Sequence, residues 1–207
     1  MKWGSVSIST IGRPFRARPV TQPLMRTDRL SIAKLALRDC DDLRTYYLDN
    51  REHLDVWEPK RTAAFHSIEN WRARASLAEQ EMREGRCVKL VVRDAESQDV
   101  LGVCNFSNIV RGPFQACTLG YSLAEQAQGR GIMFEALTAS IDYMFRVENL
   151  HRIMANHLPE NERSARLLAR LGFEVEGLAK AYLQIAGTWR DHVLTARTNP
   201  DHRTDAW

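Results

Sequence analysis

Several features are missing from this 207-residue sequence, and each absence narrows what the protein can be. No apolar run approaches the roughly 20 residues that span a bilayer, and residues 1–10 hold too few consecutive apolar side chains for a signal peptide. We therefore expect a cytoplasmic protein with no membrane partner. The six histidines form no H-E-x-x-H pattern, and the cysteines show no C-x-x-C spacing. The sequence thus predicts no metal site, and it predicts reduced core positions for Cys40, Cys87, Cys104 and Cys117.

The charge is modest overall but unevenly distributed. The formal net charge is +3, yet residues 1–30 hold six Lys or Arg residues against the single acid Asp28. We interpret residues 1–23 as a basic, flexible arm, residues 24–200 as one domain and residues 201–207 as a C-terminal tail. A basic arm without a regular spacing of apolar residues has two interpretations. It contacts nucleic acid or a ribosomal surface, or it is a solvated leader.

The order of predicted elements indicates a mixed α/β domain built around one central sheet. With 44% hydrophobic side chains, the chain is long enough for one compact domain and short for two. Apolar spacing and capping residues predict helices over 39–53, 67–84, 132–147 and about 161–171, the last ended by Gly172 in a left-handed conformation. Strands are predicted over 29–37, 87–93, 100–106, 117–123 and 152–157, followed by a hairpin of 182–185 with 188–195.

The most informative segment is a glycine-punctuated loop, residues 126–131, that stands directly before a predicted helix. Such a loop is an anion cradle, because N–H groups at a helix start are unpaired and glycine lets the backbone approach a phosphate. A Walker loop would carry Lys and then Ser or Thr after the last glycine, where this chain has Ile132 and Met133. A dinucleotide fingerprint would carry Gly or Ala where this chain has Phe134. Neither nucleotide-binding motif fits.

The loop does match the pattern Gln/Arg-x-x-Gly-x-Gly/Ala, although a Gly-x-Gly turn before a helix is often only a turn. Other motifs stand in order along the chain, at residues 26–30, 57–59, 102–108, 119–122, 128–138, 151–156, 168–173 and 189–195. Together these motifs resemble the ribosomal-protein-alanine N-acetyltransferases of the GNAT superfamily over residues 24–200. The resemblance implies the GNAT acyl-CoA N-acyltransferase fold, which is a single mixed central sheet with flanking helices and a splayed pair of parallel strands.

The resemblance also implies that acetyl-CoA is the cosubstrate and that the glycine loop holds its pyrophosphate. The strand before the loop would offer backbone groups to the pantetheine arm, with a bulge expected at Gly120. One preorganised N–H donor to the thioester oxygen is worth about 3 kcal/mol of barrier height. Arg130 either adds a charge-assisted contact or is solvated. The expected acetyl-CoA-binding residues are Tyr121, Ser122, Leu123, Gln126, Gln128, Gly129, Arg130, Gly131, Ile132, Met133, Asn161 and Ser164.

Two residues are candidates for the proton transfers of the reaction. In related ribosomal-protein acetyltransferases a serine at the spacing of Ser164 protonates the departing thiolate; helix capping is the alternative role for Asn161 and Ser164. Glu58 is the candidate general base; the alternative is that Glu58 is an exposed or salt-bridged residue without a catalytic role. A free α-amino group has a pKa of about 7.7–8.0, so a water relay is also sufficient. The expected acceptor-binding residues are Trp57, Glu58, Asn105 and Tyr182.

The acceptor is implied by the resemblance rather than by the loop. It is the N-terminal alanine amine of the small-subunit ribosomal protein S-five, attacking acetyl-CoA directly in a ternary complex. Two alternatives stay open. One is a GNAT enzyme that acetylates another protein N-terminus, a small amine or an antibiotic; the other is a ribosome-assembly factor that binds the small subunit or its RNA through the basic arm.

Overall fold

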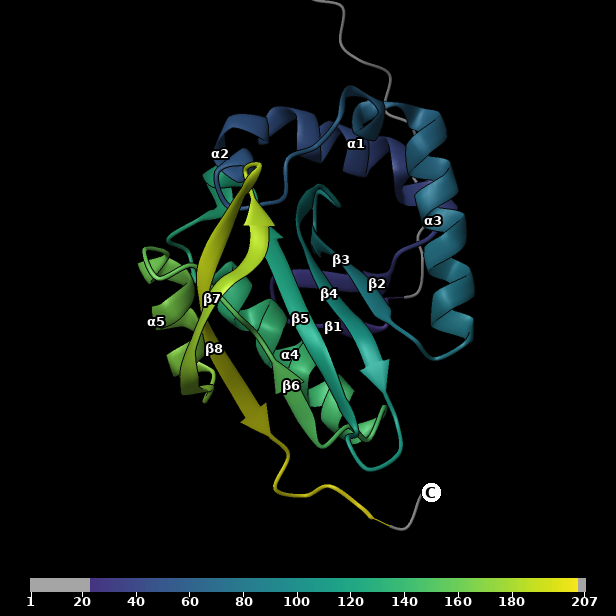
Figure 1. Cartoon of the computed structure of the whole chain (residues 1–207). Helices are drawn as coiled ribbons and strands as arrows, with labels where there is room; N and C mark the ends of the chain where they lie inside the picture. Colours follow the sequence, from purple (N-terminus) through teal and green to yellow (C-terminus); the bar gives the residue numbers. More distant parts are fainter. Residues whose placement is uncertain (1–22, 205–207) are drawn as a thin grey trace, which may run out of the picture.

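A mixed sheet in the order β1-β2-β3-β4-β5-β6-β8-β7 forms the centre of the molecule (Figure 1). The computed structural model describes residues 23–204, so the predicted basic arm lies outside the described residues except for Pro23. Within the described part every neighbouring pair of strands is antiparallel except β5 and β6. The strands are β1 Met25–Arg26, β2 Leu30–Lys34, β3 Val88–Asp94, β4 Val100–Val110, β5 Ala116–Leu123, β6 Arg152–Met154, β7 Glu174–Ile185 and β8 Thr188–Thr198.

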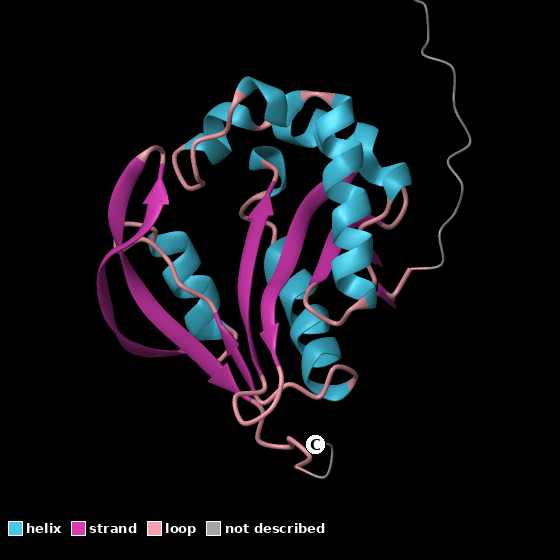
Figure 2. Cartoon of the chain, turned by 45° about the vertical axis from the view of Figure 1, so that its right-hand side comes forward, coloured by secondary structure: helices cyan, strands magenta, loops and turns pink. Residues whose placement is uncertain are grey.

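Helices cover both faces of this sheet, as Figure 2 shows from a second side. One face carries η1 Leu37–Asp39, α1 Cys40–Asp49, α2 Arg51–Asp55, η2 Ala63–His66 and α3 Ile68–Arg83, and the other carries α4 Ile132–Arg146 and α5 Glu162–Arg170. The short helix η3 Glu125–Ala127 joins the end of β5 to the glycine loop. The predicted α/β architecture is confirmed.

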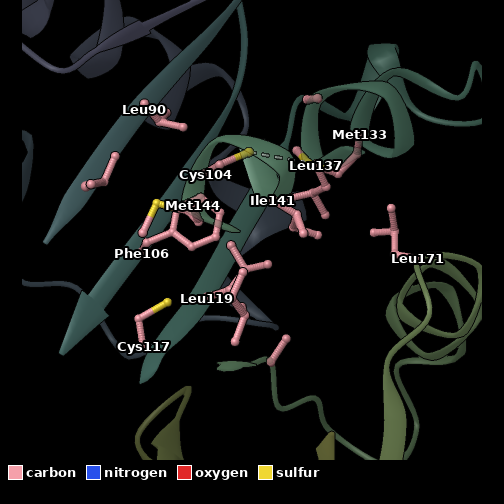
Figure 3. Close-up of a cluster of buried hydrophobic side chains, with 14 of the residues drawn as sticks. Leu90, Cys104, Phe106, Cys117, Leu119, Met133, Leu137, Ile141, Met144 and Leu171 are labelled. Atoms are coloured by element: carbon pink, nitrogen blue, oxygen red, sulfur yellow. Dashed lines mark hydrogen bonds between the residues drawn. The ribbon is translucent and has the colours of Figure 1, made fainter. Parts of the chain in front are cut away.

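Strand alternation divides the core into two clusters, because successive side chains of a strand point to opposite faces. On β4, Cys104 and Phe106 pack against α4, whereas Val103 packs against α1 and α3. Figure 3 shows the cluster on the α4 side, in which the Cys104 and Met133 sulfur atoms lie 3.8 Å apart. All four cysteines are buried and free, as the sequence predicts.

Three capping predictions are confirmed and one is wrong. The Ser67 and Asn161 side chains accept hydrogen bonds at the starts of α3 and α5, and Gly172 after α5 has a φ of 80°. Asp39 precedes α1 but does not cap it with its side chain. Its carboxylate instead accepts from the backbone N–H of Ala36 and pairs with Arg93 at 2.9 Å.

Other predicted boundaries differ from the structure for local reasons. The predicted helix 39–53 is interrupted at Asn50, whose side chain donates to the Tyr46 carbonyl and accepts from the Glu125 N–H. Strand β6 ends at Met154, earlier than predicted. Strand β7 begins at Glu174 rather than at Tyr182; its side chains are exposed on both faces, so the sequence shows no alternation there.

Candidate active site

The parallel strands β5 and β6 separate after three paired residues. They pair from Ala116 to Thr118 only, while β5 continues to Leu123. Beyond β6 the chain stays with β8 instead, because the Ala155 N–H donates to the Thr195 carbonyl at 2.9 Å. The far half of β5 therefore has an open backbone edge, as expected for the splayed pair.

The register of β4 and β5 identifies which N–H groups point to that edge. Ala124 donates to the Leu101 carbonyl at 2.8 Å, and the pairing continues regularly with Ser122 opposite Val103 and Tyr121 opposite Cys104. In an antiparallel pair the backbone groups alternate between the two sides of a strand. The N–H groups of Tyr121 and Leu123 therefore face the open edge, whereas that of Ser122 faces β4.

The expected bulge at Gly120 is not present. Gly120 lies opposite Asn105 in regular register, and the irregularity of this strand pair falls between Ser107 and Val110. The open edge of β5 thus results from the early end of β6 rather than from a bulge.

The predicted anion cradle lies at the end of β5. Gly129 and Gly131 have φ values of 72° and 74°, in the left-handed region that favours glycine, and α4 begins at Ile132. The Ile132 and Met133 side chains are buried in the core, so only their backbone N–H groups face the cradle. A Cβ at Gly129 would meet no atom within 4 Å, which leaves room for a ligand. Left-handed glycines, free N–H groups and a helix start together fit a diphosphate.

A contact from the first hairpin holds this cradle in place. Arg29 donates to the Arg130 carbonyl at 2.9 Å and to the Glu135 carboxylate at 2.7 Å, and Thr27 also donates to Glu135. Burial alone would raise the pKa of Glu135, but the hydrogen bonds from Thr27 and Arg29 outweigh it and lower the pKa. Sequence reasoning missed Arg29 as a site residue, although it stands in the motif at residues 26–30.

Gln128 connects the cradle to two helices. Its Nε2 lies 2.7 Å from His53 Nε2 on α2, and its Oε1 accepts a hydrogen bond from Arg163 on α5. His53 and Arg163 are two further residues that sequence reasoning missed: His53 stands in no recognisable motif, and Arg163 stands between Asn161 and Ser164 without an assigned role. The side chains of Gln126 and Arg130 are exposed beside this network.

Ser164 and Tyr121 lie together at the open edge. The Asn161 Oδ1 accepts from the Ser164 N–H at 3.0 Å, which is the predicted helix cap. The Ser164 hydroxyl makes a second contact, to the Tyr121 hydroxyl at 2.7 Å. Burial raises the pKa of Tyr121 to about 12, and the Ser164 hydrogen bond only partly opposes this. Tyr121 therefore keeps its proton at neutral pH, so its hydroxyl is able to donate to Ser164.

The segment around Glu58 meets the tip of the β7–β8 hairpin. The Ala186 N–H donates to the Glu58 carbonyl at 3.0 Å, and the Glu58 carboxylate pairs with Arg61, whose Nε lies 3.0 Å away. Trp57 next to it is partly exposed. The structure thus brings Trp57 and Glu58 to the hairpin that carries Tyr182, whose hydroxyl accepts from Asn156 at 3.3 Å.

Asn105 lies elsewhere, on the face of the sheet that α1 and α3 cover. On the same face the Ser122 hydroxyl lies 3.0 Å from the Tyr46 hydroxyl. Among residues 23–204, no group of three His, Cys, Asp or Glu side chains is placed to hold a metal ion, and no helix is long and apolar enough to cross a bilayer.

Comparisons with known proteins agree with this geometry. Residues 29–174 match the model of the acetyltransferase (GNAT) domain family. The chain is 50% identical over 177 residues, 86% of its own length and 91% of the relative's, to the [ribosomal protein uS5]-alanine N-acetyltransferase of Escherichia coli K12. The crystal structure of the ribosomal-protein-S5-alanine acetyltransferase of Vibrio fischeri is 41% identical, with a TM-score of 0.83 over 86% of this chain and 98% of that one. Mycobacterium smegmatis RimJ in complex with CoA-disulfide is 32% identical, with a TM-score of 0.77 over 82% of this chain and 81% of that one.

Proposed function

The chain belongs to the GNAT acetyltransferase family, and we propose that it transfers the acetyl group of acetyl-CoA to the N-terminal alanine amine of ribosomal protein uS5. This proposal rests on the 50% sequence identity, over most of both chains, to an enzyme named for this reaction. The site is compatible with it, because β5 carries the open strand edge and Tyr121 of the hydroxyl pair, and the glycine loop that can cradle a diphosphate follows the end of β5. The proposed place of action is the cytoplasm, where ribosomal proteins are made.

Acetyl-CoA would lie with its diphosphate on the backbone of residues 129–133 and its pantetheine arm along the open edge of β5. This position accounts for the splay, since the arm can hydrogen-bond to backbone groups that β6 leaves unpaired. The N–H groups of Tyr121 and Leu123 are the available donors to the thioester oxygen. The hydrogen bond from either N–H group would become stronger as negative charge develops on that oxygen.

The reaction then needs one proton removed and one supplied. The neutral α-amine attacks the thioester carbon, the C–S bond breaks, the amine loses its extra proton to a base, and the CoA thiolate gains a proton. Ser164 is our proposed proton donor to the thiolate; the Tyr121 hydroxyl replaces that proton as it leaves, and Tyr121 regains its own from water that carries the proton released by the amine. Tyr121 orients the Ser164 hydroxyl by donating to its oxygen, which leaves the Ser164 proton free to point toward the sulfur.

Glu58 remains our proposed base, acting through a water molecule. Its pairing with Arg61 orients the carboxylate, and its segment contacts the hairpin tip beside Tyr182. Because the α-amine has a pKa of about 7.7–8.0, a weak base is sufficient at neutral pH. Trp57, Tyr182 and Asn105 are our proposed contacts to the acceptor peptide.

The direct test compares acceptors in a steady-state assay that detects released CoA. We expect acetylation of a peptide with the uS5 N-terminal sequence, and a much lower kcat/KM when its alanine is already acetylated or replaced by proline. Spermidine and phosphinothricin are the matched small-amine acceptors, because the chain also shows weaker similarity to enzymes named for these substrates. A kcat/KM for either small amine above that for the peptide would refute the proposed acceptor.

Binding to the small ribosomal subunit or its RNA through residues 1–23 is a separate proposal. It is supported only by the excess of basic residues in that arm. Co-sedimentation with small subunits across a salt series, with the full chain and with a variant lacking residues 1–22, tests it. Equal binding by both proteins would refute it.

A further inference from the structure

We propose that a cavity between α1, α3, β3 and β4 binds an acidic side chain close to the N-terminus of the acceptor peptide. This inference rests on the proposed function and adds a specificity-determining site to it. The helices α1 and α3 that border the cavity lie on the face of the sheet opposite to α4 and α5 (Figure 2), and the lining residues place the cavity on that face.

The cavity is small, polar and positively charged. It has a volume of about 150 Å³, which suits one side chain rather than a whole cosubstrate. Arg74 and Lys89 line it together with Asn105 and Ser107, and no Asp or Glu of the described chain is among its lining residues. A cavity with two cations and no acid favours an anionic occupant.

Two donors of the cavity wall have no acceptor among the described residues: the exposed Arg74 guanidinium and the buried Trp71 indole N–H. The Arg74 guanidinium packs over the rings of Phe65 and Trp71, at 4.8 Å and 5.6 Å, and makes no ion pair or hydrogen bond with any described residue. The Trp71 indole N–H is buried and also has no hydrogen-bond partner in the described chain. A carboxylate in the cavity would accept from the Arg74 guanidinium, which offers several N–H donors to its two oxygens.

The charges around Arg74 favour the same kind of occupant. Burial and the nearby Arg61 lower the pKa of Arg74, and Tyr47 and Glu58 only partly oppose this. Arg61 is already paired with Glu58, and the other cation of the cavity, Lys89, lies at the 4.0 Å limit of a contact with Glu81. Of these cations, Arg74 is the one that forms no ion pair with a described residue, so it is the one left to pair with an anionic occupant.

The position of the cavity relative to the open edge of β5 limits which peptide residue can reach it. Asn105 in the cavity wall lies directly opposite Gly120, which adjoins Tyr121. A Cβ at Gly120 would meet no atom within 4 Å, so the sheet surface between cavity and reaction centre is open. Strands lie about 4.8 Å apart and an extended peptide advances about 3.3 Å per residue. The cavity is therefore within reach of the second to fourth residue of an acceptor whose amine lies at the open edge.

The test uses peptides that begin with alanine and carry one glutamate at position 2, 3 or 4, each compared with the same peptide carrying glutamine there. The assay measures kcat/KM for acetylation by the wild-type enzyme and by the variants Arg74→Gln, Arg74→Lys and Arg72→Gln. Arg72 is the matched control, because it is an exposed arginine on the same helix that does not line the cavity.

We expect the wild-type enzyme to prefer glutamate over glutamine by about tenfold at one of the three positions. Arg74→Gln should reduce this ratio to near one, Arg74→Lys should retain part of it, and Arg72→Gln should retain all of it. Equal rates for glutamate and glutamine peptides, or an unchanged ratio in Arg74→Gln, would overturn the inference alone. Failure of the wild-type enzyme to acetylate any alanine peptide would instead overturn the proposed function, and this inference with it.

Discussion

Replacing Tyr121 with phenylalanine tests the proposed proton delivery at a single atom. The variant keeps the ring and removes the hydroxyl that lies 2.7 Å from Ser164 Oγ. Loss of one neutral, partly buried hydrogen bond should reduce the free energy of unfolding by about 1 kcal/mol. The cost to catalysis should be larger, because Ser164 loses the donor that stabilises its oxygen as its proton leaves.

The expected decrease in kcat can be estimated from the role of Tyr121 as a hydrogen-bond donor to the Ser164 oxygen. One preorganised donor to a fully developed oxyanion is worth about 3 kcal/mol, and the Ser164 oxygen carries only part of a negative charge. We therefore expect a barrier increase of about 1.4–2.7 kcal/mol, which corresponds to a roughly ten- to hundredfold lower kcat. Acetyl-CoA affinity, measured by calorimetry, should change little, because the proposed contact of Tyr121 with the cosubstrate is through its backbone.

The chain supplies a matched control for this variant. Tyr46→Phe removes a similar tyrosine–serine hydrogen bond, 3.0 Å long, on the opposite face of β5. It should lose a comparable free energy of unfolding without the large decrease in kcat. The double variant Tyr121→Phe/Ser164→Ala should be no slower than Ser164→Ala by more than about twofold, because both residues act in one step. A full kcat in Tyr121→Phe, or losses that multiply in the double variant, would refute the reasoning.

Further predictions concern the strand pair, the cradle, the base and the buried ionisable groups. Gly102→Ala should cost about 1–3 kcal/mol of unfolding free energy in a denaturant titration, because its Cβ would lie 2.4 Å from the Ser122 carbonyl oxygen; wild-type stability would contradict this contact. Arg29→Gln should raise the KM for acetyl-CoA severalfold, with a smaller change in kcat, and an unaltered KM would remove its positioning role. Glu58→Gln should change the pH dependence of kcat/KM, and an identical profile would exclude Glu58 as the base. Burial raises the pKa of Tyr47 and Tyr121 to about 12, above the unfolded value of 10, so stability should be lost as pH rises from 10 to 12. An alkaline unfolding curve that stays flat across this range would contradict that burial.

Much of the fold was predictable because its signals are local. The helix after the glycine loop has apolar residues at helical spacing, and Ser67, Asn161 and Gly172 have the capping roles that their residue types favour. Strand β7 was predicted only from residue 182 onward, because its first half is an exposed edge without alternation. The carboxylate of Asp39 forms a tertiary pair with Arg93, and this overrides its local tendency to cap α1.

The part of the candidate site that depends on local backbone conformation was predictable from the sequence. The part that depends on side-chain contacts between residues far apart in the sequence was not. The cradle follows from two glycines and a helix start, all within a few residues. The contact of Arg29 with Glu135 joins residues 106 positions apart, and no local pattern encodes such a pair. The same holds for the two partners of Gln128, which come from α2 and α5.

The central claim concerns the acceptor, and mass spectrometry of ribosomal proteins tests it most directly. Ribosomal proteins would be purified from cells with and without this protein, and the N-terminal peptide of each would be examined for an acetyl group. The account predicts that the alanine N-terminus of uS5 is acetylated in the first sample and free in the second, with other ribosomal N-termini unchanged. Normal acetylation of uS5 in cells that lack the protein would contradict the account.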